Sequence, residues 1–252
     1  MEINMTVQTY EEGGRAGACR EFLLHEARET GLERVLILPI PTTRDKVHLK
    51  DSGILLSDIE KQADEQTLVI GYDLPLDFAS RLFERGARVY DASLDELFLE
   101  KNAELTALAT LGILLTGGEC ALSDMKIGIV GFGRIGRSLA RMLMFHGAEV
   151  RIFTSRNSTR LELGGAGVAV SASCKDADLS RVDILINTAP AVIFEYGVPP
   201  GIRVIDLASG DNFPGTRVEK YPSIPAKMFP ISAGRELGQS AMRFLNRGEN
   251  FA

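Results

Sequence analysis

A glycine-rich run near the middle of the chain has the residue types and the spacing of a phosphate-binding turn. The run is Gly131-Phe132-Gly133-Arg134-Ile135-Gly136, and it lies between a short apolar segment and a helical pattern. In such a turn the first glycine allows the tight bend, the second lets the backbone approach a pyrophosphate, and the third allows close helix–sheet contact. The free N–H groups at the start of the helix would hold the phosphates. We therefore expect a dinucleotide to bind at this turn.

The end of the next predicted strand decides which dinucleotide is expected. A protein that binds NAD usually places Asp or Glu there, about 20 residues after the glycines, to bind the ribose 2′-hydroxyl. This chain has Thr154-Ser155-Arg156 at that point and no acid before Glu162. Hydroxyl groups with an arginine suit a 2′-phosphate, because the guanidinium offers a planar fork of donors. We expect NADP rather than NAD; the alternative is that Arg156 is a solvated surface residue.

Two later strand ends also carry polar residues. Asn187-Thr188-Ala189-Pro190 and Asp206-Leu207-Ala208 each follow an apolar run. Ligands of open parallel sheets bind beyond the carboxyl ends of the strands, so both segments are candidates to border the nicotinamide and its ribose. An equally open alternative is that Asn187 and Asp206 are simple turn residues.

The elements that must position these residues are short apolar runs alternating with helical patterns, which is typical of β-α-β units. Leucines at helical spacing predict a long helix from Leu94 to Thr116. We expect an α/β fold with two lobes: a C-terminal Rossmann domain with a doubly wound parallel sheet, and a smaller N-terminal α/β lobe, joined by that connector helix. The predicted boundaries are a substrate lobe at 1–93, the connector and Rossmann domain at 94–232, and a C-terminal helix at 233–252 that packs back on the first lobe or the connector.

Composition limits the class of partner. The net charge is −6 without a cluster of Lys and Arg, which argues against nucleic acid or an anionic membrane. The apolar runs have strand length, far short of a membrane span, and residues 1–10 lack a secretory signal pattern. The three cysteines and three histidines have no metal-binding spacing. We expect no metal, and unpaired thiols in a reducing cytoplasm.

Further short segments accompany the glycine run: Leu36-Ile37-Leu38-Pro39, residues 102–106, Ile186-Asn187-Thr188-Ala189-Pro190, Ile205-Asp206-Leu207-Ala208-Ser209 and Ser232-Ala233-Gly234. Together they resemble the dipicolinate synthase family of spore-forming bacteria, in the chain that binds the dinucleotide, and, more distantly, the D-2-hydroxyacid dehydrogenases. The resemblance implies NADP-dependent oxidation of a dihydrodipicolinate-like heterocycle to pyridine-2,6-dicarboxylate. It also implies a separate partner chain that is flavoprotein-like. We expect a homo-oligomer as well.

The chain departs from both families at identifiable points. It is shorter than a typical dipicolinate synthase chain, its first forty residues match poorly, and the loop before the last helix is compressed to residues 229–234. A D-2-hydroxyacid dehydrogenase needs an Arg soon after the Asn-Thr strand end and a late His. Pro190-Ala191 stands in the first place, and no histidine follows His146. Hydroxyacid dehydrogenase activity is therefore not expected.

A substrate that carries carboxylates needs hydrogen-bond donors in the cleft expected between the lobes. The candidates are Thr42 and Thr43, with Arg44, after a strand end, Asn102 and Thr106 on one face of the connector helix, and Ser232 in the compressed loop. An equally open alternative is that residues 42–44 form an ordinary polar loop. The sequence does not identify any residue as a general acid or base. Two other functions stay open: a non-catalytic NAD(P)-binding regulatory protein, and a reductase of another small carbonyl or carboxylate compound.

Overall fold

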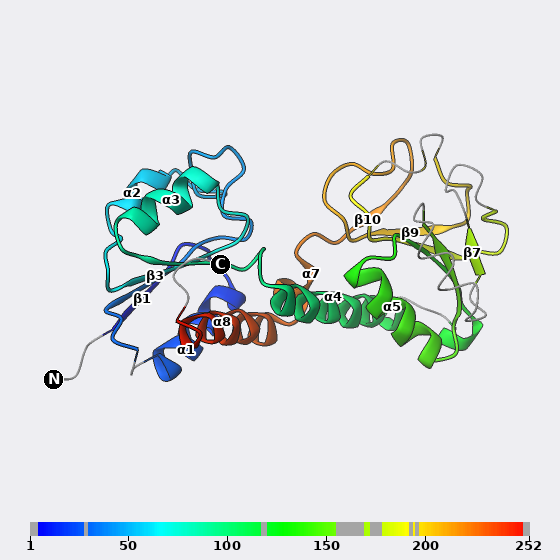
Figure 1. Cartoon of the computed structure of the whole chain (residues 1–252). Coiled ribbons are helices and arrows are strands. Elements are labelled where there is room, and N and C mark those ends of the chain that lie inside the picture. Colours follow the sequence, from blue (N-terminus) through cyan, green and yellow to red (C-terminus); the bar gives the residue numbers. More distant parts are fainter. Residues whose placement is uncertain are drawn as a thin grey trace. The chain divides into compact units, whose positions relative to one another are not determined.

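The computed structural model describes residues 5–27, 30–116, 120–154, 169–171, 178–191, 194 and 197–248. It divides the chain into two compact units (Figure 1). Unit 1 comprises Met1–Asn102 and Pro225–Ala252, and unit 2 comprises Ala103–Ile224. Helix α4 (Glu96–Thr116) begins in unit 1 and ends in unit 2. No helix among the described residues is long and apolar enough to cross a membrane.

Unit 1 contains a parallel sheet of four strands in the order β1-β2-β3-β4. Its strands are β1 (Thr6–Thr9), β2 (Arg34–Ile37), β3 (Thr67–Gly71) and β4 (Arg88–Asp91). Its helices are α1 (Gly14–Glu26), α2 (Leu56–Glu60), α3 (Leu76–Glu84) and α8 (Pro230–Asn246). Helices cover both faces, so the strands are apolar on both sides, as buried parallel strands are.

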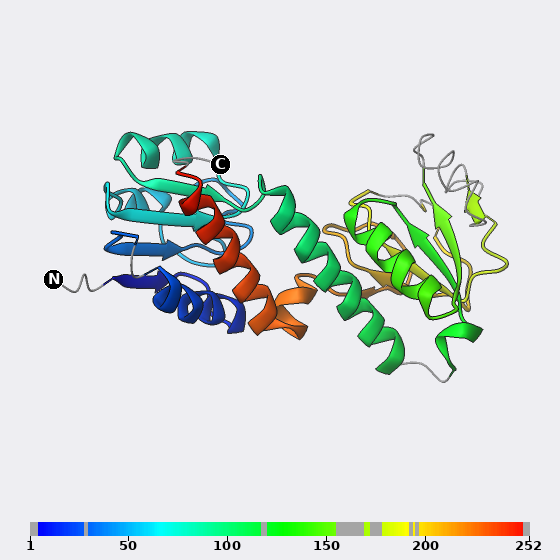
Figure 2. The ribbon, with the colours of Figure 1, turned by 60° about the horizontal axis from the view of Figure 1, so that its bottom comes forward.

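The two faces of this sheet have separate cores because successive side chains of a strand point to opposite sides. On one face Val35 and Ile37 of β2 pack with residues of α1 and α8. On the other face Leu36 of β2 packs with Ile59 of α2 and residues of α3. Figure 1 shows α1 and α8 on one side of the sheet and α2 and α3 on the other, and Figure 2 shows α8 crossing the sheet beside α1.

The β-α-β connections of this sheet include crossovers of both hands. The steps β1–α1–β2 and β2–α2–β3 advance in the same direction across the sheet, yet their helices lie on opposite faces. The step β3–α3–β4 uses the same face as α2. Right-handed crossovers form about 98% of all such connections, so we assign the left hand to the single step through α1.

Helices α1 and α8 approach closely at glycines. A Cβ at Gly14 would lie 2.6 Å from Cβ of Pro230, and a Cβ at Gly238 would collide with the ring of Phe22. A Cβ at Gly234 would overlap the carbonyl oxygen of Arg15 and lie 2.7 Å from Cβ of Ala18. The absence of side chains at these positions is what lets α8 dock on α1.

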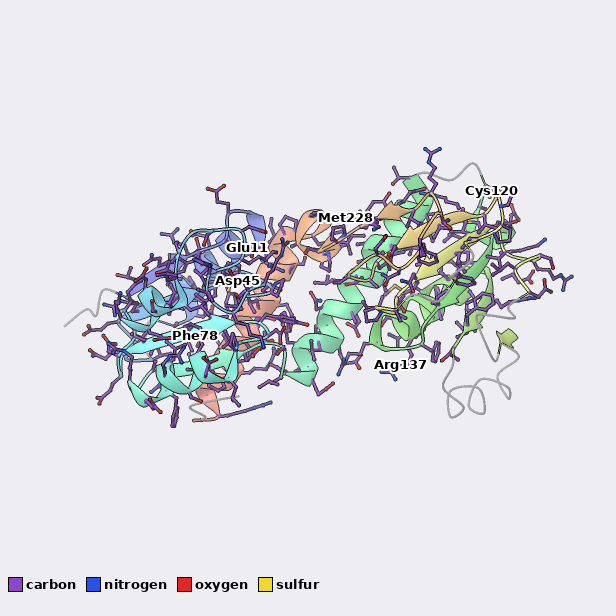
Figure 3. The ribbon with its side chains drawn as sticks, turned by 90° about the horizontal axis from the view of Figure 1, so that it is seen from above. Glu11, Asp45, Phe78, Cys120, Arg137 and Met228 are labelled. Carbon is purple, nitrogen blue, oxygen red and sulfur yellow. The ribbon has the colours of Figure 1, made fainter. Side chains whose placement is uncertain are left out.

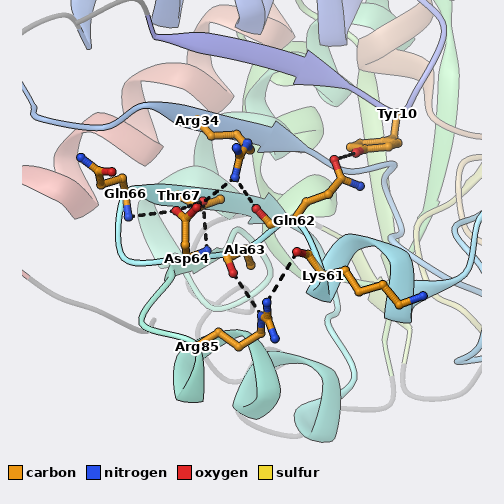
Figure 4. A network of polar contacts seen from close by, with 9 residues as sticks. All are labelled: Tyr10, Arg34, Lys61, Gln62, Ala63, Asp64, Gln66, Thr67 and Arg85. Atoms are coloured by element: carbon orange, nitrogen blue, oxygen red, sulfur yellow. Dashed lines mark hydrogen bonds and ion pairs between the residues drawn. The ribbon is translucent and has the colours of Figure 1, made fainter.

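A polar network fixes the turn between α2 and β3 (Figure 4). The guanidinium of Arg34 donates to the carbonyl of Gln62 and, at 3.2 Å, to Asp64, while Arg85 Nε donates to the carbonyl of Ala63 at 3.1 Å. Thr67 Oγ1 donates to Asp64 Oδ1 at 2.6 Å, and this hydrogen bond is the main cause that lowers the pKa of the Asp64 carboxyl. The network thus satisfies turn carbonyls that would otherwise lack donors.

Unit 2 contains a parallel sheet of six strands in the order β10-β9-β8-β5-β6-β7. The strands are β5 (Lys126–Val130), β6 (Glu149–Phe153), β7 (Ala169–Ser171), β8 (Ile184–Asn187), β9 (Arg203–Asp206) and β10 (Glu219–Lys220). Counted from β5, the order is 3-2-1-4-5-6 when read from β7, which is that of the dinucleotide-binding Rossmann fold. The α/β fold class and the C-terminal Rossmann domain predicted from the sequence are confirmed.

One face of this sheet is packed by α4 and α5 (Arg134–Phe145). Leu111 and Leu114 of α4 and Leu139 and Leu143 of α5 share a core with Ile127 of β5. The C-terminal part of α4 is thus a helix of unit 2 as well as a link between the units.

The last helix begins earlier than the sequence predicts. A loop is expected at 229–234, but α8 already starts at Pro230, which occupies the first helical turn. Proline is favoured there because its missing N–H has no intrahelical partner to lose. The short elements β10, α7 (Ile224–Met228) and the 3-10 turn Leu122–Asp124 carry no sequence pattern that predicts them.

Candidate nucleotide-binding site

The glycine run lies where the fold should bind a dinucleotide. Strand β5 ends at Val130, in the middle of the sheet, and α5 begins at Arg134 with Gly133 as its N-cap residue. The chain order reverses on either side of β5, because β6 and β8 flank it. Crevices at such a switch point are the usual ligand sites of open α/β sheets.

Three glycines of the run meet three different surroundings. Gly131 has a φ of +88°, and a Cβ there would lie 2.8 Å from Thr188 Oγ1. A Cβ at Gly136 would overlap the carbonyl oxygen of Gly131, so this glycine permits the close contact of α5 with the turn. At Gly133 a Cβ would meet no atom within 4 Å. Open space at the second glycine, between two crowded ones, fits the approach of a pyrophosphate to the backbone.

The start of α5 has the electrostatics expected of an anion site. Its first turn holds no acidic residue and its N-cap makes no side-chain hydrogen bond. Arg134 is half-buried and Arg137, labelled in Figure 3, is exposed, and both have interaction partners. Phe132 packs against the core of unit 2 and Ile135 is half-buried, so these two side chains support the turn. The positive end of the helix dipole therefore adds to two arginines at this edge.

The residue that should select the coenzyme follows β6. Thr154 is buried, 5% exposed, and it has interaction partners. Ser155 and Arg156, also predicted to bind the cofactor, lie outside the described residues. Thr154 directly follows β6, the strand next to β5, and so occupies the position where an acid would bind a ribose hydroxyl.

The strand ends of β8 and β9 carry the next group of predicted residues. Asn187 and Asp206 are neighbours in register and nearly fully buried. Asn187 Nδ2 donates to Asp206 Oδ1 at 2.8 Å and to the carbonyl of Ala189 at 2.9 Å, and Asn187 Oδ1 accepts the N–H of Ala189 at 3.1 Å. Asp206 Oδ1 also accepts the N–H of Ala208 at 3.1 Å. The side chains of Asn187 and Asp206 thus form hydrogen bonds with atoms of unit 2, as expected under the alternative that they are turn residues.

The neighbouring residues of these two segments form the rest of the edge. Thr188 Oγ1 donates to the carbonyl of Val130 at 2.9 Å and so ties the β8 turn to the glycine run. Ala189, Leu207 and Ala208 are half-buried, and Pro190 is exposed. The backbone of both turns is therefore held firmly at the carboxyl edge of the sheet.

Asn212 is a member of this edge that sequence reasoning missed. It is 4% exposed, and its Nδ2 donates to Asp206 Oδ2 at 3.1 Å and to the carbonyl of Ser209 at 3.2 Å. No motif or spacing marks it, because it lies in an irregular segment and its partner is defined only by the folded turn.

Of the predicted substrate residues in unit 1, Thr42 and Thr43 lie in the segment after β2. Thr42 is fully buried, and its Oγ1 accepts the N–H of Tyr72 at 2.9 Å, so its side chain braces two segments of the unit. Thr43 Oγ1 accepts the N–H of Lys46 at 2.9 Å. Nearby, Asp45 accepts the N–H groups of His48 and Val47, and the hydrogen bonds from His48 are the main cause that lowers its carboxyl pKa. This segment is tightly folded; Figure 3 labels Asp45 there and Glu11 after β1.

The other predicted substrate residues lie on helices. Asn102 and Thr106 are both on α4, half-buried and buried respectively, and both have interaction partners. Asn102 belongs to unit 1 and Thr106 to unit 2. Ser232 is exposed in the first turn of α8 rather than in a loop, so its expected setting is wrong. The structure does not bring these residues together within one unit, and their contact with a substrate stays a prediction.

Comparison with known protein families supports this class of site. Residues 116–192 match the NAD-binding domain of the D-isomer specific 2-hydroxyacid dehydrogenases. The match contains the glycine run, Thr154 and the β8 turn. Together with the turn geometry it supports a nicotinamide dinucleotide as cofactor.

Comparison with solved structures shows proteins whose whole fold resembles that of this chain. A dipicolinate synthase chain from Bacillus halodurans has a TM-score of 0.77 and 19% identity, covering 97% of this chain and 99% of that one. The corresponding dipicolinate synthase chain from Bacillus subtilis has a TM-score of 0.75 and 15% identity, with 98% of each chain covered. D-lactate dehydrogenase from Escherichia coli has a TM-score of 0.57 and 14% identity, covering 96% and 97%. No curated protein sequence matches the chain. The resemblance predicted from the sequence is thus confirmed as a similarity of fold.

Proposed function

We propose that the protein is a nicotinamide-dinucleotide-dependent oxidoreductase whose cofactor binds at the carboxyl edge of the unit 2 sheet. The observation that carries the proposal is the glycine run. Gly133 faces open space, while Gly131 and Gly136 allow the bend and the close packing that expose the N-terminus of α5. A position without a side chain, beside the N–H groups of a helix N-terminus, suits a pyrophosphate.

The reaction we propose is that of dipicolinate synthase, oxidation of a dihydrodipicolinate-like heterocycle to pyridine-2,6-dicarboxylate. Fold similarity across nearly the whole of both chains supports it, as do the segments quoted from the sequence. Aromatisation of such a ring removes one hydride and one proton; the dinucleotide supplies the hydride acceptor, and the proton passes to solvent. Orientation of the ring is then the main task left to the protein.

We propose NADP(H) as the preferred cofactor. Thr154 carries no charge at the position where an acid would both bind a ribose hydroxyl and repel a 2′-phosphate. The following Ser155-Arg156 offers a hydroxyl and a guanidinium to the phosphate. This preference rests on residue types at the end of β6.

Calorimetry and turnover together test the proposal. Titration with NADP, NAD and their reduced forms should give measurable affinity, tighter for the NADP pair, and binding should raise the melting temperature by mass action. Addition of a dihydropyridine dicarboxylate with NADP should then produce NADPH, followed by its absorbance, in proportion to the pyridine dicarboxylate formed.

The outcomes separate the competing functions. Failure of every nicotinamide dinucleotide to bind would overturn the cofactor site. Binding without turnover of any dihydropyridine would favour a regulatory NAD(P)-binding protein. Turnover of a different carbonyl compound in a substrate screen would favour a reductase. A required flavoprotein-like partner would show as turnover only in the mixture, and self-association is measured by sedimentation.

A further inference from the structure

We propose that Asn212 is a positioning residue for the nicotinamide half of the bound dinucleotide. By holding Asp206, Asn212 fixes the turns at 188–190 and 207–209, where that half is expected to dock. The inference rests on the proposed function, because it assigns a role within the same site. It concerns a residue that neither the motif nor the family match on residues 116–192 contains.

The first step is the geometry of the buried carboxylate. Asp206 is 1% exposed, and each of its oxygens accepts hydrogen bonds from neutral groups. Oδ1 accepts from Asn187 Nδ2 at 2.8 Å and from the N–H of Ala208 at 3.1 Å, and Oδ2 accepts from Asn212 Nδ2 at 3.1 Å. Removal of the donor from a buried carboxyl oxygen is costly, because it leaves that oxygen without its hydrogen bond. Asn212 is therefore needed to keep Asp206 in this orientation.

The second step links that carboxylate to the two turns. The side chain of Asn187 pairs with both the N–H and the carbonyl of Ala189, and the side chain of Asp206 pairs with the N–H of Ala208. Each strand-end side chain thus holds the backbone two residues further on. The 2.8 Å bond between Asn187 and Asp206 couples the two turns. Loss of Asn212 would loosen the β9 turn directly and the β8 turn through Asn187.

The third step is the location of these turns. In a Rossmann sheet the two halves bind the two nucleotides, and β8 and β9 belong to the half beyond the switch point. The adenosine half is expected near the end of β6, at Thr154. Since Asn187 and Asp206 face each other, their side chains place the two turns, whose remaining backbone and side-chain groups border the nicotinamide. A role in their placement should therefore affect one end of the ligand more than the other.

The test compares a complete dinucleotide with one that lacks nicotinamide. Asn212→Ala should weaken binding of NADP about tenfold, which equals about 1.4 kcal/mol. It should change the dissociation constant of 2′-phospho-ADP-ribose by less than about twofold. Thr110→Val is the control, because it removes another buried hydrogen bond of unit 2, from Thr110 to the carbonyl of Thr106 within α4. The control should leave both affinities unchanged.

Other results would overturn the inference. An equal loss for both ligands would indicate general loosening of unit 2, and no loss would show that Asn212 is dispensable. If the unaltered protein binds no dinucleotide, the proposed function itself fails. Amide exchange in the unaltered protein gives a measurement that does not depend on the variant. The N–H groups of Ala189 and Ala208 should exchange slowly before nucleotide is added, and rapid exchange would contradict the preformed arrangement.

Discussion

The first strand of each sheet is followed by glycines and a helix, yet the two helix starts differ in what packs against them. After β5, Gly133 faces open space above the start of α5. After β1, Gly14 lies at the start of α1 against Pro230 of α8, and Gly234 of α8 lies against the backbone of Arg15. The N-cap glycines of the two helices, Gly13 and Gly133, both meet no atom within 4 Å, but among the described residues only the first turn of α1 is covered by another helix of its unit.

Arginine side chains lie at the start of both helices. Arg15 donates to both oxygens of Glu11, at 2.9 and 2.7 Å, and their side chains are only 11% and 24% exposed. Arg15, in the first turn of α1, is therefore neutralised by an acid of the segment that precedes the helix. The first helical turns of α1 and α5 both hold no acid, and Arg134 and Arg137 of α5 also have interaction partners. The packing around a glycine turn, rather than the glycines themselves, therefore distinguishes the two helix starts.

The largest expected effect is on the unit 1 side of this comparison. Gly234→Ala should lower the free energy of unfolding by about 3 kcal/mol, because the added methyl overlaps the backbone of α1 and the helices must separate. Chemical denaturation measures the loss. Affinity for NADP should stay unchanged, since the glycine run belongs to unit 2.

Labelling of a buried thiol and a control at a second glycine test whether the effect of Gly234→Ala arises at the α1–α8 contact. Cys19 of α1 is fully buried, and desolvation raises its pKa to about 12, so alkylation at mildly alkaline pH should require opening of the α1–α8 contact. Gly234→Ala should accelerate labelling of Cys19, followed by mass spectrometry. Gly17→Ala is the control: a Cβ there meets no atom within 4 Å, so it should leave stability equal or slightly raised. Slow labelling in Gly234→Ala would contradict the proposed packing role.

The next effect is on ligand binding rather than on folding. Gly133→Val should weaken NADP binding at least about a hundredfold, roughly 2.7 kcal/mol, because its side chain would enter the space expected for the pyrophosphate. The melting temperature without ligand should change little, since the Cβ position is unobstructed and φ is −80°. Unchanged affinity in calorimetry would show that the open turn is not the binding site.

A smaller effect is expected on the choice between the two coenzymes. Thr154→Asp combined with Arg156→Ala should shift the ratio of the NADP and NAD dissociation constants toward NAD by about ten- to a hundredfold. The acid restores a ribose ligand and repels the 2′-phosphate. Both constants are measured at one ionic strength, because salt weakens the phosphate contact selectively. Tighter binding of NAD by the unaltered protein would contradict the preference.

The smallest effect is expected at a charge pair that belongs to neither turn. Arg203 of β9 donates to Glu219 of β10 through two bonds of 2.8 Å, and this pairing lowers the pKa of the Glu219 carboxyl. Glu219→Gln should cost at most about 0.5 kcal/mol at neutral pH, because Glu219 is 40% exposed and water screens the pair. The stabilisation is present above the unfolded-state pKa of the carboxyl and is lost as the pH falls through the folded-state pKa. Denaturation curves of both proteins should therefore converge in acid; a constant difference would contradict the pairing.

The sequence by itself determined the local elements and their order. Apolar runs at Lys126–Val130 and Glu149–Phe153, with glycines after the first, were sufficient to predict the central strands, the turn and the Rossmann class. The long helix at Glu96–Thr116 was predicted within two residues. These features depend on side-chain periodicity and on backbone freedom, and both are determined by residues that are close together in the sequence.

Only the tertiary structure decided which residues meet. Parallel register places Asn187 beside Asp206, nineteen positions later, and the irregular segment after β9 brings Asn212 to the same carboxylate. The return of α8 to unit 1, where Gly234 contacts α1, likewise joins segments from the two ends of the sequence. These contacts follow from the order of strands in a sheet and from the packing of helices on its faces. Because they depend on residues far apart in sequence, no local pattern could reveal that α8 packs against the start of α1.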